Sequence, residues 1–273
     1  MNEAMQTIWH KAYERALETI TSLRNHCDFK YEKDSRNAKE VKVLNAYRPT
    51  VKEYVPGTKI DREYIDATAC IIPINKFFYF NIGLDDIKKA QSVPGALEAS
   101  AQEGSIALTE KGDTVVADTI KEAVTAGEVH ALTAKTLTKT NCVEFIEEGF
   151  TYLYEKNCKV SEAYHLEVCP KFFTLTRQNL TELFTNNVEM AKKGYIGKYG
   201  NALVSIENLL AKDDSGNVQN LLRTTHAVAF IEQVRKVEPY RPHDGFEDAL
   251  KGLYACGAKV VRKDEIVVLP TVA

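Results

Sequence analysis

The longest hydrophobic pattern in the chain lies in residues 95–121, where apolar or small residues recur mostly at three- and four-residue spacing. Those positions are Leu97, Ala101, Gly104, Leu108, Val115 and Thr119. Pro94, the candidate N-cap Ser92 and the acidic Glu98 suit a helix start. The pattern predicts one amphipathic spine helix, roughly 40 Å long at about 1.5 Å per residue. Its single apolar stripe is expected to face a sheet.

The remaining faces of this helix carry polar residues and are expected to face solvent. These residues are Glu98, Gln102, Glu103, Glu110, Lys111, Asp113 and Asp118.

Two different periods precede the spine helix. Residues 8–23 have apolar residues on one side at helical spacing, which predicts an amphipathic helix. From residue 40 to residue 80 the period falls to about two, with a Pro56-Gly57 turn signal, so residues 39–80 are expected to form a long hairpin. It carries too many charged and aromatic residues for burial on both faces. A long exposed hairpin favours pairing with another chain.

The second half of the chain alternates shorter segments. Residues 124–139 are rich in Ala and Thr and are expected to be a connector, and residues 213–217 a solvent loop. Helices are predicted at 141–155 and 172–185. Strands are predicted at 164–168, 202–206, 227–231, 234–237, 252–261 and 266–269, with a break at 262–265. Gly194, Gly197 and Gly200 predict turns, because their spacing matches no phosphate-binding loop.

Bulk properties are those of an ordinary globular protein. The 273 residues are 44% hydrophobic and 27% charged, with a formal net charge of -3, which suits one or two domains. No run approaches the ~18 apolar residues of a membrane span, and the N-terminus lacks the order of a signal peptide, so we expect a cytoplasmic protein. The near-neutral charge argues against a dedicated nucleic-acid binder.

Candidate chemistry is sparse. The six cysteines have no CxxC pair and no histidine at metal-ligand spacing, so we interpret them as buried thiols. His10 and His26 are interpreted as surface or core-edge residues, because neither has a chelating neighbour. An enzyme would have to use Cys169 or Cys27 with a distant histidine, an arrangement that chance alone supplies. We therefore predict no catalytic, metal or cofactor-binding residue.

Four stretches resemble segments of a known family, and they occur in the same order as in that family. They are 48–60 (RPTVKEYVPGTKI), 76–91 (KFFYFNIGLDDIKKAQ), 194–209 (GYIGKYGNALVSIENL) and 229–261 (AFIEQVRKVEPYRPHDGFEDALKGLYACGAKVV). The chain resembles the major capsid protein of tailed bacteriophages, whose fold is called the HK97-like or Johnson fold. The resemblance implies an α+β fold. It divides the chain into an N-terminal arm (1–37), an extended loop with its adjoining strand (38–80), a peripheral domain with the spine helix (81–138), an axial domain (139–233) and a C-terminal return to the peripheral domain (234–273).

The same resemblance implies a structural protein that self-assembles into hexamers and pentamers of an icosahedral head enclosing the phage genome. The implied partners are other copies of the chain, packaged double-stranded DNA contacted without sequence specificity, and no membrane. The resemblance leaves open whether a separate scaffolding protein, a portal and decoration proteins are further partners. The implied location is the virion capsid, with synthesis in the host cytoplasm. An encapsulin-like compartment is the alternative within the fold.

The protruding hairpin supplies the expected contacts between subunits. Its candidate contact residues combine charge with aromatic rings: Tyr47, Arg48, Lys52, Glu53, Tyr54 and Lys59.

Overall fold

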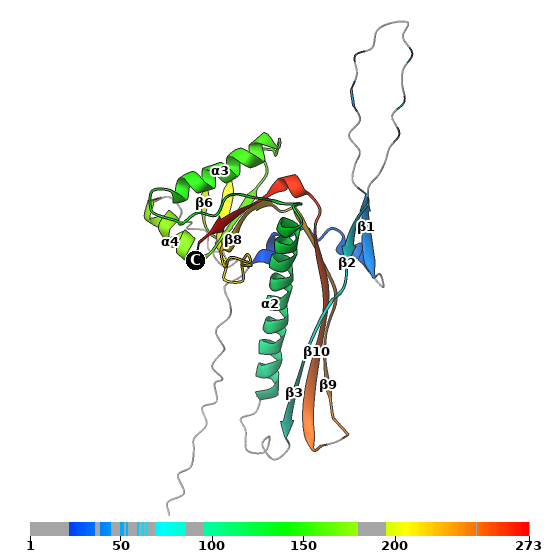
Figure 1. Ribbon diagram of the computed structural model, residues 1–273. Coiled ribbons are helices and arrows are strands. Elements are labelled where there is room, and N and C mark those ends of the chain that lie inside the picture. Colours follow the sequence, from blue (N-terminus) through cyan, green and yellow to red (C-terminus); the bar gives the residue numbers. More distant parts are fainter. Residues whose placement is uncertain are drawn as a thin grey trace, which may run out of the picture.

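The computed structural model describes residues 22–35, 39–44, 69–85, 96–179, 195–243 and 245–272, together with positions 50, 51, 53, 59, 62 and 64. Three sheets and one long helix organise these residues (Figure 1). A three-stranded ribbon lies beside the long helix, a six-stranded sheet lies beyond one end of both, and a two-stranded hairpin base stands beside that junction. The fold is a mixture of helices and sheets, as expected.

The ribbon consists of β3 (Lys76–Asp85), β10 (Glu247–Val260) and β9 (Val228–Tyr240), in that order and antiparallel throughout. Two predictions need correction here. Residues 76–80 belong to the ribbon and not to the preceding hairpin, because β3 pairs along its whole length with β10. The two strands predicted at 227–231 and 234–237 are one continuous strand. The first error arose because alternation predicts a strand but not its partner. The second arose because pairing with β10 continues the strand past the point where local alternation fades.

The predicted spine helix is confirmed as α2 (Ala96–Thr125), which continues four residues beyond the expected end. Glycine allows α2 to approach the ribbon closely. The ring of Phe80 lies between Gly104 of α2 and Gly252 of β10, where added Cβ atoms would come within 2.9 and 2.2 Å of that ring. At Gly112, an added Cβ would lie 2.5 Å from the Tyr254 hydroxyl oxygen. The helix therefore lies against the ribbon at a distance that side chains at these positions would prevent.

The prediction that α2 has one apolar stripe and is otherwise exposed to solvent is wrong. Asp113, expected in solvent, is only 3% exposed, and Val116 and Ala117 are also buried. A short 3-10 helix, η1 (Leu23–His26), packs on this part of α2 and covers a second face. The N-terminal residues that cover it lie almost ninety positions earlier in the sequence, so helical periodicity could not reveal the contact.

The six-stranded sheet has the order β4-β11-β8-β5-β7-β6. Its strands are β4 (His130–Ala131), β5 (Tyr164–Val168), β6 (Tyr195–Tyr199), β7 (Ala202–Ile206), β8 (Val218–Thr224) and β11 (Ile266–Thr271). β4 runs parallel to β11 and β5 parallel to β7, while the other neighbours are antiparallel. The strands predicted at 164–168 and 202–206 are confirmed. The turn predicted around Gly197 is wrong, because that residue lies within β6, whereas Gly200 forms the β6–β7 turn at φ 54°.

Two helices accompany this sheet. α3 (Cys142–Glu155) confirms the helix predicted at 141–155 and buries Phe145, Ile146 and Leu153. α4 (Pro170–Asn179) begins two residues before the predicted start, with proline at its first position. The predicted break at 262–265 is confirmed by the 3-10 helix η3 (Lys263–Glu265), which joins the ribbon to the six-stranded sheet.

The hairpin base is formed by β1 (Glu40–Leu44) and β2 (Ala69–Pro73), paired antiparallel from Glu40 to Pro73. This confirms a hairpin that closes around residues 45–68. The base packs through Val41 and Ile72 on residues of β9. Another 3-10 helix, η2 (Glu32–Ser35), precedes β1. The helix predicted at residues 8–23 lies outside the described residues, apart from its last two positions. No helix among the described residues combines the length and apolarity needed to cross a membrane.

Leu108 tests the packing of α2 on the ribbon. Its side chain is 5% exposed within the main core, so Leu108→Asp would bury an unpaired carboxylate and lower the free energy of unfolding by several kcal/mol, on the order of 3. Urea unfolding followed by circular dichroism measures the change. The neighbouring residue Ala107 is exposed, so Ala107→Asp is the matched control and should unfold like the wild type. Equal stability of both variants would contradict burial of this face.

Gly252 tests the close approach around Phe80. Gly252→Ala would place a methyl group 2.2 Å from the Phe80 ring, and we expect a loss of about 1 to 3 kcal/mol of unfolding free energy. In a Phe80→Ala background the same substitution should cost much less, because the obstructing ring is gone. Urea unfolding of the four proteins gives the coupling. An equal cost in both backgrounds would show that the ring does not restrict this position.

Candidate assembly surfaces

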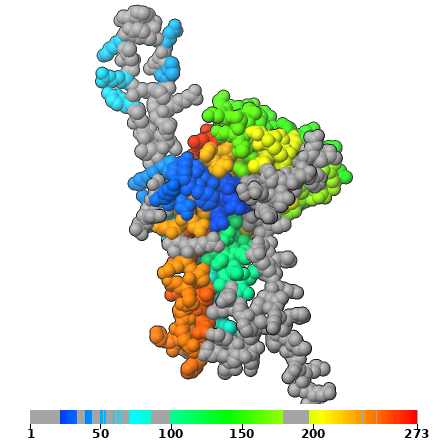
Figure 2. Space-filling model, turned by 180° about the vertical axis from the view of Figure 1, so that it is seen from behind, coloured from blue at the N-terminus to red at the C-terminus, as the bar shows by residue number. Residues whose placement is uncertain are grey.

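Residues 22–26, which we call the N-terminal segment, are held in place by charged side chains from three other parts of the chain. Glu207, just after β7, accepts hydrogen bonds from the backbone N–H of Ser22 at 2.7 Å and from its hydroxyl. Asp113 of α2 accepts from the backbone N–H of Arg24 at 2.6 Å. Arg223 of β8 donates to the carbonyl oxygens of Leu23 and His26, both at 2.8 Å. Seen from behind, this segment lies across the middle of the molecule, between the ribbon and the six-stranded sheet (Figure 2).

A buried charge cluster of His26, His165, Glu167 and Arg223 joins this segment to the six-stranded sheet. The Arg223 guanidinium binds both oxygens of Glu167, at 2.9 and 2.7 Å, and Nδ1 of His26 lies 2.5 Å from Oε1 of the same carboxylate. The His26 ring stacks on His165 with centroids 4.2 Å apart. Arg223, Glu167 and His26 have no exposed surface, so the prediction of a surface or core-edge His26 is wrong. Removing one member would leave an uncompensated buried charge.

Burial and pairing shift the pKa values in this cluster in different directions. Burial by itself would raise the pKa of Glu167, but the Arg223 charge and the His26 hydrogen bond outweigh it and hold that pKa at about 2. Burial, helped by the neighbouring His26, lowers the pKa of His165 to about 3. Burial raises the pKa of Asp113 above its usual range. Glu167 is therefore ionised and His165 neutral at neutral pH.

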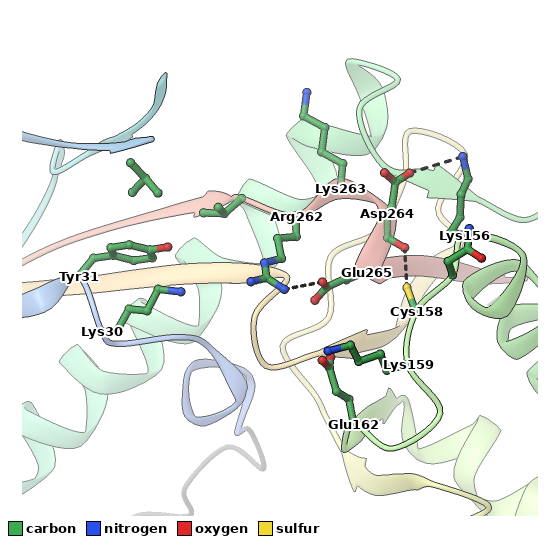
Figure 3. A pocket seen from close by; sticks show the side chains of 13 residues that line it. Lys30, Tyr31, Lys156, Cys158, Lys159, Glu162, Arg262, Lys263, Asp264 and Glu265 are labelled. Atoms are coloured by element: carbon green, nitrogen blue, oxygen red, sulfur yellow. Dashed lines mark hydrogen bonds and ion pairs between the residues drawn. The ribbon is translucent and has the colours of Figure 1, made fainter. Parts of the chain in front are cut away.

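A charged pocket of about 800 Å³ lies where the ribbon meets the six-stranded sheet (Figure 3). Its charged lining residues are the bases Lys30, Lys156, Lys159, Arg262 and Lys263 and the acids Glu162, Asp264 and Glu265. Ion pairs cross it, from Arg262 to Glu265 at 2.7 Å and from Lys156 to Asp264 at 3.5 Å. The Lys156–Asp264 pair links the residue that follows α3 to η3. Both of its side chains are largely exposed, so it adds little to stability.

Large apolar side chains are exposed on the ribbon surface that faces away from α2. Phe77 and Tyr79 of β3 and Leu253 of β10 are 64%, 79% and 47% exposed, and Leu253 pairs in register with Tyr79. We call these three residues the ribbon face. Next to them, Glu238 of β9 pairs with Lys251 at 3.7 Å and also with Lys236. An apolar patch rimmed by charges is typical of a surface that binds another protein.

Of the predicted contact residues, Glu53 and Lys59 fall within the described positions, and both are exposed. Tyr47, Arg48, Lys52 and Tyr54 lie outside them, so this contact remains a prediction. Sequence reasoning missed the ribbon face. Aromatic residues occupy both faces of β3, with Phe78 and Phe80 turned toward the core, so alternation could not tell the exposed rings from the buried ones.

The enzyme alternative finds no support at Cys27. Burial raises the pKa of its thiol to about 11, and the thiol donates to the carbonyl oxygen of Leu23 at 3.4 Å. A catalytic cysteine needs the opposite shift, because the thiolate is the nucleophile. Among the residues that the structure describes, no group of three or more His, Cys, Asp or Glu side chains could hold a metal ion.

No family model matches the sequence, and no curated protein matches it either. Solved structures do match. A chain of Mycobacterium phage Che8 is similar at 23% identity and a TM-score of 0.80, with 98% of each chain covered. The capsid structure of the cyanophage P-SCSP1u matches at 15% identity and a TM-score of 0.76, covering 98% of this chain and 93% of that one. This chain has the fold of a phage capsid protein.

The mature capsid of bacteriophage PhiM1 matches as well, at 15% identity and a TM-score of 0.72, with 98% of this chain and 92% of that chain covered. Each match spans almost the whole of both chains, so the capsid fold accounts for all parts of the molecule and not for one domain. Nothing in these comparisons favours the encapsulin or the enzyme alternative.

The buried histidine makes stability sensitive to acid. The unfolded chain protonates His165 near pH 6.5, whereas the folded chain resists protonation down to about pH 3, so stability should fall as the pH drops through this range. Between pH 6.5 and pH 5 the loss from this group is at most about 2 kcal/mol. Glu167 adds a further loss only below about pH 4.5, and Asp113 acts in the opposite direction.

Urea unfolding at pH 7 and pH 5 measures this effect. His165→Gln should lose less stability between the two values than the wild type, since it has no group to protonate. The exposed His130 provides the matched control, and His130→Gln should keep the wild-type slope. A slope unchanged by His165→Gln would show that this ring is not the acid-sensitive group.

Proposed function

We propose that this protein is a shell subunit that self-assembles into hexamers and pentamers of an icosahedral phage head enclosing the genome. The observation that carries the proposal is the likeness over nearly the whole chain to chains of phage capsids. No step of this function needs catalysis. Its chemistry is the energetics of contacts between copies of the chain.

The HK97-like layout forms part of this proposal. Residues 1–37 would be the arm, 38–80 the extended loop and its strand, 81–138 with 234–273 the peripheral domain, and 139–233 the axial domain. In support, α2 packs on the ribbon, and α3 and α4 pack on the six-stranded sheet. The core of α2 and the core around α3 are formed by different sets of buried residues.

The loop would make the contact between subunits. All six described positions between 45 and 68 are exposed, and Val51 and Tyr64 are 93% and 85% exposed. The ribbon face is a second exposed apolar surface on the same chain. We infer that the loop of one copy, through Tyr47, Arg48, Lys52, Glu53, Tyr54 and Lys59, lies on the ribbon face of its neighbour. Both apolar surfaces would then leave water together.

Shell assembly by this route uses many modest contacts. A loop, an arm and a helix together can exceed the ~2,000 Å² of buried surface that marks obligate assemblies. Exposed charge pairs contribute only about 0.2 to 1 kcal/mol each and mainly set register and orientation. A separate scaffold, a portal, decoration proteins and non-specific DNA contacts belong to the same proposal, as does synthesis in the host cytoplasm.

The direct test is the assembly state of the purified full chain, expressed alone and with any scaffold encoded beside it. Analytical ultracentrifugation and electron microscopy should find capsomers, tubes or closed shells of megadalton mass. A protein that stays monomeric at high concentration under both conditions would refute the proposal.

Charge reversal in the loop separates assembly from folding. Arg48→Glu combined with Lys52→Glu should leave the melting temperature nearly unchanged, because exposed substitutions usually shift stability by no more than about 0.5 kcal/mol. Assembly should fail or become strongly salt-dependent, since these charges would now face the wrong sign on the neighbour. Circular dichroism melting and sedimentation at low and high salt measure both effects.

The matched control keeps the charges and exchanges their carriers, with Arg48→Lys and Lys52→Arg, and should assemble normally. Normal shells from the reversed variant would remove the loop charges from the interface. Loss of the fold in that variant would place these residues in the core of the subunit instead.

A further inference from the structure

The solvent side of α3 carries acidic side chains and no basic one. Its four glutamates are all exposed and line a shallow groove of about 650 Å³: Glu144, Glu147, Glu148 and Glu155. Leu132 and Val143, both half-buried, add apolar surface to the same groove. We call this surface the acidic groove. Apolar residues rimmed by charges are typical of a surface that binds another protein.

Two of the four acids have partners within the chain. Glu148 pairs with Lys135 at 2.5 Å, and Glu147 accepts a hydrogen bond from a tyrosine hydroxyl of β6. Glu144 and Glu155, by contrast, form no ion pair with any residue that the structure describes. The acidic groove therefore keeps an excess of negative charge toward both ends of α3, and a basic surface would complement it.

The neighbouring helix α4 has the opposite character. It contains no acid, and Lys171 and Arg177 flank Thr174 on its exposed side. We call these three residues the basic face. Within one chain, α4 packs on α3 through the buried rings of Phe172 and Phe145, whose centroids are 6.4 Å apart. No ion pair between described residues joins the two helices, so the charges of both surfaces are left for another molecule.

The dimensions of the two surfaces agree. Glu144 and Glu155 are three helical turns apart, which places them on one face and about 16 Å from each other along the axis. Lys171 and Arg177 are about 9 Å apart along α4, so both bases fit along the groove at once. The bases of the charged pocket suit the groove less well, because most of them already pair with acids of the same chain: Lys30, Lys156, Arg262 and Lys263.

The two surfaces belong to different helices and different places on the molecule. In Figure 1, α3 lies along the top of the six-stranded sheet, whereas α4 lies at its lower left. One copy can thus present its acidic groove to one neighbour and its basic face to another. A contact between two different surfaces of the same chain repeats head to tail, and it closes into a ring when the rotation between neighbours allows it.

We propose that the acidic groove of one copy binds the basic face of the next copy, so that repeats of this contact close the rings of the shell. The inference rests on the proposed self-assembly and adds to it the two surfaces that meet and their direction around the ring. The charges set the register and orientation of neighbouring copies. Leu132 and Val143 lose their remaining contact with water when the groove is covered.

Reversing either surface tests the contact. Glu144→Lys with Glu155→Lys makes both surfaces basic, and Lys171→Glu with Arg177→Glu makes both acidic. Each double variant should sediment as unassembled subunits, because like charges then meet across the contact. Both should melt like the wild type, since all four positions are exposed and the two changes in α3 act on its helix dipole in opposite directions. The control Glu144→Asp with Glu155→Asp keeps the charges and should assemble normally.

Combining the two double variants gives a more specific test. All four reversals in one chain exchange the signs of the two surfaces and should restore assembly. A mixture of the two double variants should also assemble, but only with unlike copies alternating around each ring. Alternation is possible in a ring with an even number of copies and impossible in one with an odd number. Electron microscopy of the mixture should therefore show hexamers, and tubes or sheets built from them, without pentamers.

Normal shells from either double variant would overturn this contact and leave the proposed function intact. A chain with all four reversals that melts like the wild type and stays unassembled would overturn it as well, because the groove would then serve a different partner. Closed shells with pentamers from the mixture would have the same meaning. Wild-type chains that never assemble would instead refute the proposed function. If a reversed variant melts early, Glu144→Gln with Glu155→Gln replaces it and should weaken assembly several-fold.

Discussion

Arg223 lies at the point where separate parts of the fold meet. Its guanidinium binds Glu167 on the neighbouring strand and also donates to two carbonyl oxygens of the N-terminal segment. The same segment reaches α2 through Asp113 and the end of β7 through Glu207. One fully buried cation therefore links the sheet to a segment that touches the spine helix. Because a buried charge is tolerated only with partners in place, the parts must assemble together.

A second constraint determines how α2 packs on the ribbon. Phe80 fits between two glycines, which sets how closely α2 can lie on the ribbon. Both constraints depend on contacts between elements that are far apart in the sequence. The ion pairs of the charged pocket act at the same junction, where η3 connects the ribbon to the six-stranded sheet.

The surfaces of the molecule differ in character from its interior. In the interior, burial raises the pKa of the Cys27 thiol and lowers the pKa of His165, which shifts both groups away from catalytic use. Its unusual features are on the outside, where the ribbon face and the described loop positions expose apolar and aromatic residues. The proposed assembly from many copies of the chain would need apolar contact residues on the outside of a subunit that has already folded. The capsid fold of the chain is consistent with that order of events.

The sequence by itself determined the elements whose signal is local. Helical spacing predicted α2 and α3, alternation predicted β5 and β7, and the polar break at 262–265 marked η3. The four family-like stretches predicted the fold that the matching structures show. Tertiary structure alone decided which charged residues are buried. Asp113, Glu167 and Arg223 look like surface residues in the sequence, because their partners are far away, as with the 197 positions between Arg223 and His26. Burying a charge becomes favourable only when folding brings those partners together, so no local pattern could reveal it.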